Sequence, residues 1–141
     1  MSLIFWDTNL FVYWMEDHPD WSPKVERMRT RMLERQDQLC TSALTIGELL
    51  AAPYKQQDRE LAGRYQTALR SPWVQVLSFG PETADHYAQI RAQWTIRPAD
   101  AIQLACAAQA RVDLFVTNDQ RLSRLQVPGI QFITNLDVSV L

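Results

Sequence analysis

Residues 2–9 read Ser-Leu-Ile-Phe-Trp-Asp-Thr-Asn, and this stretch decides the fold. It starts as an apolar run, which ends abruptly at the polar residues Asp7, Thr8 and Asn9. A short apolar run that stops at a polar loop is typical of a buried strand in a parallel sheet. We therefore predict a strand over residues 2–6. Asp7 is then expected at its carboxyl end, where the ligand sites of parallel α/β sheets lie.

Strand and helix patterns alternate through the rest of the chain. We predict further strands at residues 39–43, 73–79, 113–117 and 131–134. Helices are predicted at residues 10–15, 23–36, 45–52, 58–69, 80–94 and 98–111, and Pro53 is expected to end the third of them. This alternation predicts an α/β fold, a three-layer α/β/α sandwich with a central, mainly parallel sheet of about five strands. The whole chain, residues 1–141, is expected to form one domain.

The composition is that of a globular protein. Hydrophobic residues make up 47% of the 141 residues and charged residues 21%, with few glycines and prolines. No apolar run approaches the roughly 20 residues of a membrane span, and the first residues lack the features of a signal peptide. A cytoplasmic protein is therefore expected. Cys40 and Cys106 lie far apart in the chain and are expected to be reduced, buried thiols rather than a disulfide or a zinc site.

The net charge of −2 excludes a protein that binds polyanions through overall basicity. Such a ligand needs a local basic patch or a metal ion. The predicted helix 23–36 offers a patch, because arginines alternate there with apolar residues that recur at helical spacing. The apolar positions are Val25, Met28, Met32 and Leu33, and the basic ones are Arg27, Arg29, Arg31 and Arg35. We expect one buried and one basic face on this helix, and guanidinium groups suit contacts with phosphate.

Acidic residues from separate segments are predicted to meet at one edge of the sheet. Asp7 follows the first predicted strand directly, Asp119 follows strand 113–117 closely, and Asp100 begins the helix after Pro98. Glu48 follows strand 39–43 by about one helical turn, so its carboxylate can reach back over the same edge. Because the carboxyl ends of parallel strands share one edge, these side chains are expected to converge.

Converging carboxylates need a counter-charge. Two like charges about 4 Å apart repel by roughly 1 kcal/mol in water and roughly 4 kcal/mol at the effective dielectric of a protein surface. Either some of the acids take up protons or a divalent cation neutralises them. Oxygen ligands favour Mg²⁺ or Mn²⁺, and no His or Cys lies nearby in sequence to favour zinc. Such an ion leaves positions for a phosphate oxygen and a water, which is the arrangement for phosphodiester hydrolysis.

Each acid has a plainer explanation when it is taken alone. Asp7 also suits a turn or a helix N-cap, and Asp119 suits an ordinary turn. Asp100 would complement the dipole of its helix, and Glu48 would lie on a solvated helix face. The functional interpretation therefore depends on the coincidence of all these positions in the predicted topology.

Several blocks of the sequence resemble the signature blocks of PIN domains, and they occur in the order that this family has. The blocks are Asp7-Thr8-Asn9-Leu10-Phe11-Val12-Tyr13, Ser42-x-x-Thr45-x-x-Glu48-Leu49, Pro98-Ala99-Asp100-Ala101-Ile102-Gln103-Leu104-Ala105 and Val116-Thr117-Asn118-Asp119. The resemblance spans nearly the whole chain, whose size is most similar to the toxin component of VapBC-type toxin–antitoxin pairs. It implies a Mg²⁺- or Mn²⁺-dependent endoribonuclease that is usually dimeric and is inhibited by a small antitoxin protein.

The resemblance also implies roles for individual residues. The catalytic, metal-binding acids would be Asp7, Glu48, Asp100 and Asp119, the supporting polar residues Thr117 and Asn9, and the candidate RNA contacts Arg27, Arg31 and Arg35. Two positions depart from the family pattern: Gln103 stands where a small residue is common, and Leu122 where an aromatic residue is frequent. Gln103 is expected either to alter packing or to reach the substrate groove.

Two other functions are compatible with these residues. A phosphatase-like or dehalogenase-like enzyme would use Asp7 as a covalent nucleophile, but that chemistry needs a second acid two residues on, where the chain has Asn9. A non-catalytic module would bind RNA or a protein through the arginine-rich helix, and it would have no need of the acids.

Overall fold

The computed structural model describes residues 1–137 and 141, and it centres on a five-stranded sheet. The strands are β1 (Leu3–Trp6), β2 (Gln38–Ser42), β3 (Val74–Leu77), β4 (Leu114–Thr117) and β5 (Phe132–Asn135). Their order across the sheet is β3-β2-β1-β4-β5, and every neighbouring pair is parallel. The predicted parallel sheet is therefore confirmed.

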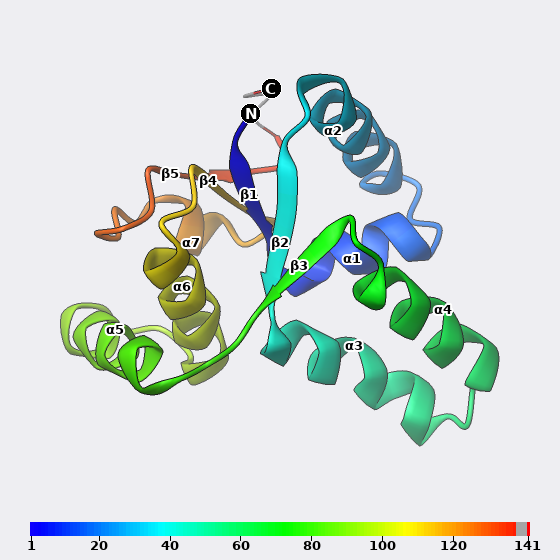
Figure 1. Ribbon diagram of the computed structural model, residues 1–141. Helices are drawn as coiled ribbons and strands as arrows, with labels where there is room; N and C mark the ends of the chain where they lie inside the picture. Colours follow the sequence, from blue (N-terminus) through cyan, green and yellow to red (C-terminus); the bar gives the residue numbers. More distant parts are fainter. Residues whose placement is uncertain (138–140) are drawn as a thin grey trace.

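Helices cover both faces of the sheet (Figure 1). They are α1 (Thr8–Met15), α2 (Ser22–Arg35), α3 (Ala43–Lys55), α4 (Arg59–Arg70), α5 (Pro81–Gln93), α6 (Pro98–Ala110) and α7 (Gln120–Ser123). The first four lie with one hydrophobic cluster and the last three with the other, which confirms the three-layer sandwich. Within the described ranges, no helix combines the length and the apolar character needed to cross a membrane.

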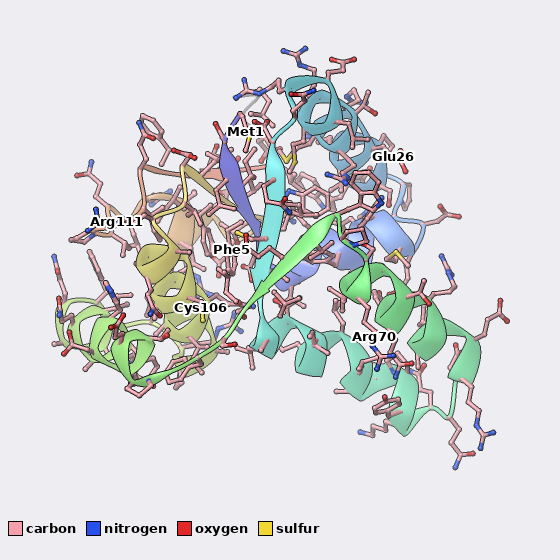
Figure 2. All side chains as sticks on the ribbon, viewed as in Figure 1. Met1, Phe5, Glu26, Arg70, Cys106 and Arg111 are labelled. Carbon is pink, nitrogen blue, oxygen red and sulfur yellow. The ribbon has the colours of Figure 1, made fainter. Side chains whose placement is uncertain are left out.

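The alternation of side chains along β1 explains how one strand serves both layers. Ile4 and Trp6 face the cluster formed with α1 to α4, whereas Phe5 faces the cluster formed with α5 to α7. The Phe5 ring stacks on Phe115 of β4, with ring centroids 4.9 Å apart. Figure 2 shows Phe5 and Cys106 inside the molecule, on the side of the sheet that α6 covers. All of these side chains are buried, so β1 holds the two layers together.

The order of the strands creates a topological switch point beside β1. The chain runs from β1 outward through β2 to β3, and it then returns to place β4 on the other side of β1 and β5 beyond it. The loops that follow β1 and β4 therefore leave the sheet side by side. In open α/β sheets, the crevice at such a point is where ligands bind. Asp7 and Asp119 follow these two strands.

One prediction about a helix was wrong, and one helix was not predicted. Pro53 does not end α3, because a proline removes only one backbone donor, and the N–H of Gln56 still donates to the carbonyl of Ala52 at 2.9 Å. The sequence pattern also missed α7, since a single turn is too short to show a helical period. Its local signal is Asp119, whose side chain accepts from the N–H of Arg121 and caps the turn.

The two faces of α2 also differ from the prediction. Arg29, expected on the basic face, is buried, and its guanidinium lies 5.8 Å from the ring centroid of Trp14. Leu33, expected on the buried face, is 53% exposed. Val25, Arg29 and Met32 are the buried positions, and their spacing of four and three residues defines one helical stripe. The apolar stem of an arginine can serve in such a stripe when its charged end rests on an aromatic ring.

Candidate functional site

Asp7 occupies the switch point directly. Its backbone N–H donates to the carbonyl of Val116 on β4 at 2.9 Å, which extends the β1–β4 pairing by one residue. Its Oδ1 accepts from the N–H of Thr8 and so caps α1, and its Oδ2 accepts from Oγ1 of Thr117 at 2.8 Å. Both carboxylate oxygens are therefore held, and the residue is only 8% exposed.

The surroundings of Asp7 disfavour its negative charge. Burial raises the pKa of Asp7 to about 6, and the charges of Asp100 and Glu48 add to the rise, whereas the hydrogen bonds from Thr117 and Thr8 oppose it. Asp100 and Glu48 thus lie within electrostatic reach of Asp7, although they come from different helices. A cation placed among these carboxylates would offset the cost of burying a negative charge and would reduce the repulsion between the acids.

Asp100 lies in the first turn of α6, where the helix dipole favours a carboxylate. It is buried, and its charge is balanced by Arg97, the N-cap residue of the same helix. Arg97 donates from Nε to Oδ2 of Asp100 at 3.0 Å and from Nη2 to Oδ1 at 3.4 Å. The guanidinium therefore covers both oxygens of Asp100.

Asp119 is arranged in a similar way after β4. Arg121 donates to Asp119 from Nε at 3.2 Å and from Nη2 at 3.0 Å, and this interaction holds the pKa of Asp119 below its usual range. The backbone N–H of Asp119 donates to Oγ1 of Thr117 at 3.0 Å. Thr117 thus joins Asp7 and Asp119 through one hydroxyl, which donates to the first and accepts from the second.

Glu48 is exposed on α3, but its Oε1 is fixed by two donors. Thr8 donates from Oγ1 at 2.7 Å, and Gln103 of α6 donates from Nε2 at 3.3 Å. Gln103 is fully buried and also donates to Thr8 and Thr45, while its carbonyl oxygen accepts from Ser42. This departure from the family pattern therefore both packs in the interior and reaches the site. A glutamine amide can satisfy all these hydroxyl groups at once because it both donates and accepts.

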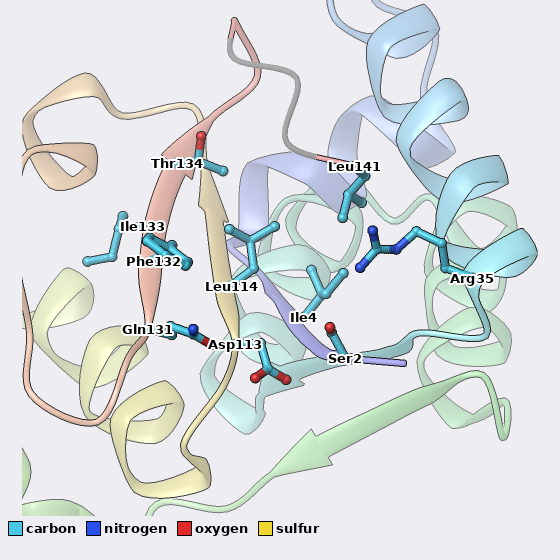
Figure 3. A pocket seen from close by; sticks show the side chains of 10 residues that line it. All are labelled: Ser2, Ile4, Arg35, Asp113, Leu114, Gln131, Phe132, Ile133, Thr134 and Leu141. Carbon is cyan, nitrogen blue, oxygen red and sulfur yellow. The ribbon is translucent and has the colours of Figure 1, made fainter.

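The other sequence-predicted residues are not brought to the acids. Asn9 is exposed in the first turn of α1, and Arg27 and Arg31 lie on the exposed side of α2. Arg35 lies at the opposite edge of the sheet, where it donates to Asp37 at 2.9 Å just before β2 begins. Figure 3 shows Arg35 there, beside Ser2 and Ile4 at a pocket of about 390 Å³.

The basic residues that do reach the acids are Arg97 and Arg121, which the sequence reasoning missed. Each lies within three residues of the acid it contacts, so the signal was a local pair of opposite charges. The structural explanation that the sequence offered for Asp7, a helix N-cap, is correct in part. Asp7 and Asp119 both act as N-caps. Capping accounts for one oxygen of Asp7, but it does not account for the burial of the whole carboxylate.

The donor set fits a hard divalent cation. The candidate ligands are carboxylate oxygens, which Mg²⁺ and Mn²⁺ prefer. In the described part of the chain, however, no three His, Cys, Asp or Glu side chains are close enough together to hold one ion. Asp100 and Asp119 instead face arginines, and Glu48 faces Thr8 and Gln103.

The fold and the site together define an all-parallel α/β protein whose switch point carries acidic side chains, among them the buried Asp7. The PIN domain family profile matches residues 4–128, and the chain therefore belongs to the PIN domain family. No curated protein sequence matches the chain.

Solved structures with the same fold come from toxin–antitoxin systems. VapBC2 from Rickettsia felis, bound to a DNA fragment from its promoter, is 19% identical with a TM-score of 0.74, covering 94% of this chain and 98% of that one. DNA-bound VapBC from Salmonella typhimurium is 24% identical with a TM-score of 0.67, covering 96% and 99%. VapC20 from Mycobacterium tuberculosis, a toxin that cleaves the sarcin–ricin loop, is 14% identical with a TM-score of 0.63, covering 79% and 86%. At these identities the likeness shows the shared fold.

Proposed function

We propose that this protein is a Mg²⁺- or Mn²⁺-dependent endoribonuclease and the toxin of a type II toxin–antitoxin pair, with residues 1–141 acting as one domain. The observation that carries the proposal is the buried carboxylate of Asp7, which lies at the switch point under the charges of Asp100 and Glu48. A buried acid with further acids near it favours either a bound proton or a bound cation. Such an arrangement is typical of a functional site.

The roles of the acids follow from their positions. Asp7 and Asp100 are the buried carboxylates and would be the principal metal ligands, with Glu48 and Asp119 completing the site directly or through water. The bound ion would supply an activated water and neutralise charge that develops on the phosphoryl group. Thr117 would keep Asp7 in place through the 2.8 Å hydrogen bond.

The remaining polar candidates make no hydrogen bond or ion pair with the site acids among the described residues and would have secondary roles. Asn9, exposed two residues after Asp7, would contact solvent or substrate. Arg27 and Arg31 would contact only an RNA long enough to pass over α2. Arg35 lies at the opposite edge of the sheet, so it would need a still longer RNA. These arginines lie apart from the acids, so they would bind the flanks of the RNA rather than the bond that is cut.

The similar structures support the partners that we propose. The Rickettsia felis and Salmonella typhimurium neighbours are VapBC assemblies bound to DNA, and the Mycobacterium tuberculosis neighbour is a toxin that cleaves the sarcin–ricin loop. By analogy, this chain would act on RNA in the cytoplasm, form a homodimer and be inhibited by a cognate antitoxin protein. Sedimentation that gives a monomer at working concentrations would overturn the dimer.

The test is cleavage of a mixed cellular RNA pool by the purified protein in Mg²⁺, Mn²⁺ or EDTA. An Asp7→Asn, Asp100→Asn double variant, purified identically, is the control. Cleavage at discrete sites that needs both the metal and the acids supports the proposal and reveals the target. Metal-independent cleavage shared by the double variant indicates a contaminant and counts against it.

A second arm separates the rival functions. Salt-sensitive RNA binding that is unaffected by EDTA, without cleavage and without growth arrest on expression, would establish a binding module instead. A phosphorylated Asp7 trapped by acid quench would establish a phosphatase-like nucleophile.

A further inference from the structure

Two arginines form ion pairs with acids of the candidate site. Arg97 and Arg121 each donate from two nitrogens to one carboxylate, Arg97 to Asp100 and Arg121 to Asp119. These hydrogen bonds are the main reason that the pKa of each arginine is raised, Arg97 by Asp100 and Arg121 by Asp119. Each guanidinium group therefore neutralises one of the candidate site acids.

Nothing else in the described structure holds these arginines in place. Their side chains are 68% and 76% exposed, and neither guanidinium has another hydrogen-bond partner among the described residues. Exposed ion pairs of this kind contribute little to stability, so they can open without disturbing the fold. Asp100 and Asp119 are mostly covered, with side chains only 11% and 17% exposed. The exposed partner in each pair is the arginine.

A divalent cation and these guanidinium groups compete for the same oxygens. A guanidinium group and a divalent cation are both attracted by the negative charge of the carboxylate and repel each other, so each weakens the binding of the other. When an ion binds the acids, Arg97 and Arg121 lose their partners but remain tethered at the ends of α6 and α7. A planar guanidinium on an exposed stem is suited to bidentate contact with a phosphate group.

Acidic side chains repel the phosphates of RNA, so an acidic RNA-binding site requires basic groups beside the acids. The chain carries a net charge of −2, so overall attraction for a polyanion is absent. The arginines of α2 lie on its exposed side or at the far edge of the sheet. Arg97 and Arg121 are instead the basic residues whose ion pairs are with the site acids.

We propose that Arg97 and Arg121 neutralise Asp100 and Asp119 until a divalent cation binds, and that they then exchange these carboxylates for the phosphates of the RNA backbone. This inference rests on the proposed nuclease function. It assigns both residues to substrate positioning, and it makes opposite predictions for metal binding and RNA binding.

The first measurement is the Mn²⁺ affinity of the whole protein by calorimetry, without RNA. We expect an Arg97→Gln, Arg121→Gln double variant to bind Mn²⁺ about threefold to tenfold more tightly than the wild type, because two competing ion pairs are gone. The matched control is Arg124→Gln, which removes a nearby exposed charge that makes no ion pair within the described residues. A double variant whose Mn²⁺ affinity is equal to or weaker than that of the control overturns the exchange.

The second measurement is the affinity for a short single-stranded RNA in Ca²⁺, across a series of salt concentrations. The double variant should bind more weakly, and its slope of log K against log salt should be shallower by about 0.7 for each phosphate that it no longer neutralises. Arg97→Lys, Arg121→Lys should regain most of the slope but less of the affinity, because lysine keeps the charge without the planar fork. An unchanged slope in the double glutamine variant overturns the phosphate contacts.

The two failures can be told apart. If the wild type neither cleaves nor binds any RNA, the proposed function fails and the phosphate contacts fail with it, while the Mn²⁺ comparison still decides the competition between arginine and metal. If the wild type cleaves RNA and the double variant matches it in metal affinity and salt slope, this inference fails and the nuclease stands.

Discussion

The hydroxyl of Thr117 donates to Oδ2 of Asp7 at 2.8 Å, and the two residues are 110 positions apart in the sequence. This bond stabilises the charged form of a buried carboxylate and, with the cap at Thr8, fixes the orientation of that carboxylate. Thr117→Val should destabilise the protein by about 1–3 kcal/mol at neutral pH and weaken metal binding. Urea denaturation and Mn²⁺ titration measure both effects.

Thr117→Ser is the control for this substitution. It keeps the hydroxyl and removes one buried methyl group, so a loss of about 1 kcal/mol is expected, with metal affinity near that of the wild type. Equal metal affinities in the valine and serine variants would show that the hydrogen bond has no role in the site.

The buried carboxylate of Asp7 should make stability depend on pH in metal-free buffer. Its folded pKa, about 6, lies above its usual value of 3.8, so the folded state retains the proton over this interval and loses stability as the pH rises through it. Asp7→Asn does not titrate. In EDTA, the stability of the variant relative to the wild type should therefore increase by about 2–3 kcal/mol between pH 4 and pH 7.

The comparison of wild type and variant removes the contribution of other carboxyl groups, because both proteins contain them. Denaturation curves at several pH values give the measurement. A stability difference that stays constant between pH 4 and pH 7 would contradict the raised pKa of Asp7. Added Mg²⁺ should stabilise the wild type more than the variant.

Gln103 should matter both for stability and for the site. Gln103→Leu leaves the buried hydroxyls of Ser42 and Thr45 without their amide partner and frees Glu48, so a loss of about 2–4 kcal/mol and of most cleavage activity is expected. Gln109→Leu, on the same helix, removes bonds to Thr83 and Glu82 away from the acids. The control should lose stability but retain activity per folded molecule.

Arg29 and Arg27 lie two positions apart on α2 and should behave differently. Arg29→Ala removes a buried stem that packs on Trp14, and a loss of about 1–2 kcal/mol is expected. Arg27→Ala changes an exposed side chain and should stay within about 0.5 kcal/mol of the wild type. Thermal unfolding measures both, and equal effects would refute the structural role of Arg29.

The two thiols should resist alkylation in the folded protein. Burial raises the pKa of Cys106 to about 11 and that of Cys40 to about 12, so at pH 8 only about one Cys106 thiol in a thousand is ionised. Iodoacetamide followed by mass spectrometry should show almost no modification until guanidinium chloride is added. Rapid alkylation without denaturant would mean that the interior around α6 opens easily.

Local patterns predicted much of this architecture. The apolar run before Asp7 was enough to predict β1, because a parallel strand that is buried on both faces consists mainly of apolar residues. The alternation of strands and helices then predicted the parallel sheet, since a parallel pair needs a long crossover. The parts that failed were also local: Pro53 was given too much weight as a helix terminator, and the single turn of α7 had no period to detect.

The sequence also predicted part of the candidate site, and the tertiary structure decided the rest. The sequence by itself determined which acids follow which strands, because the order of residues along the chain and the parallel topology place Asp7 and Asp119 at one edge. Only the tertiary structure decided that Asp7 is buried and bonded to Thr117, and that Gln103 joins Thr45 to Glu48. The physical reason is range: strand and helix patterns arise from neighbouring residues, whereas burial and hydrogen bonding between distant segments depend on how whole elements pack.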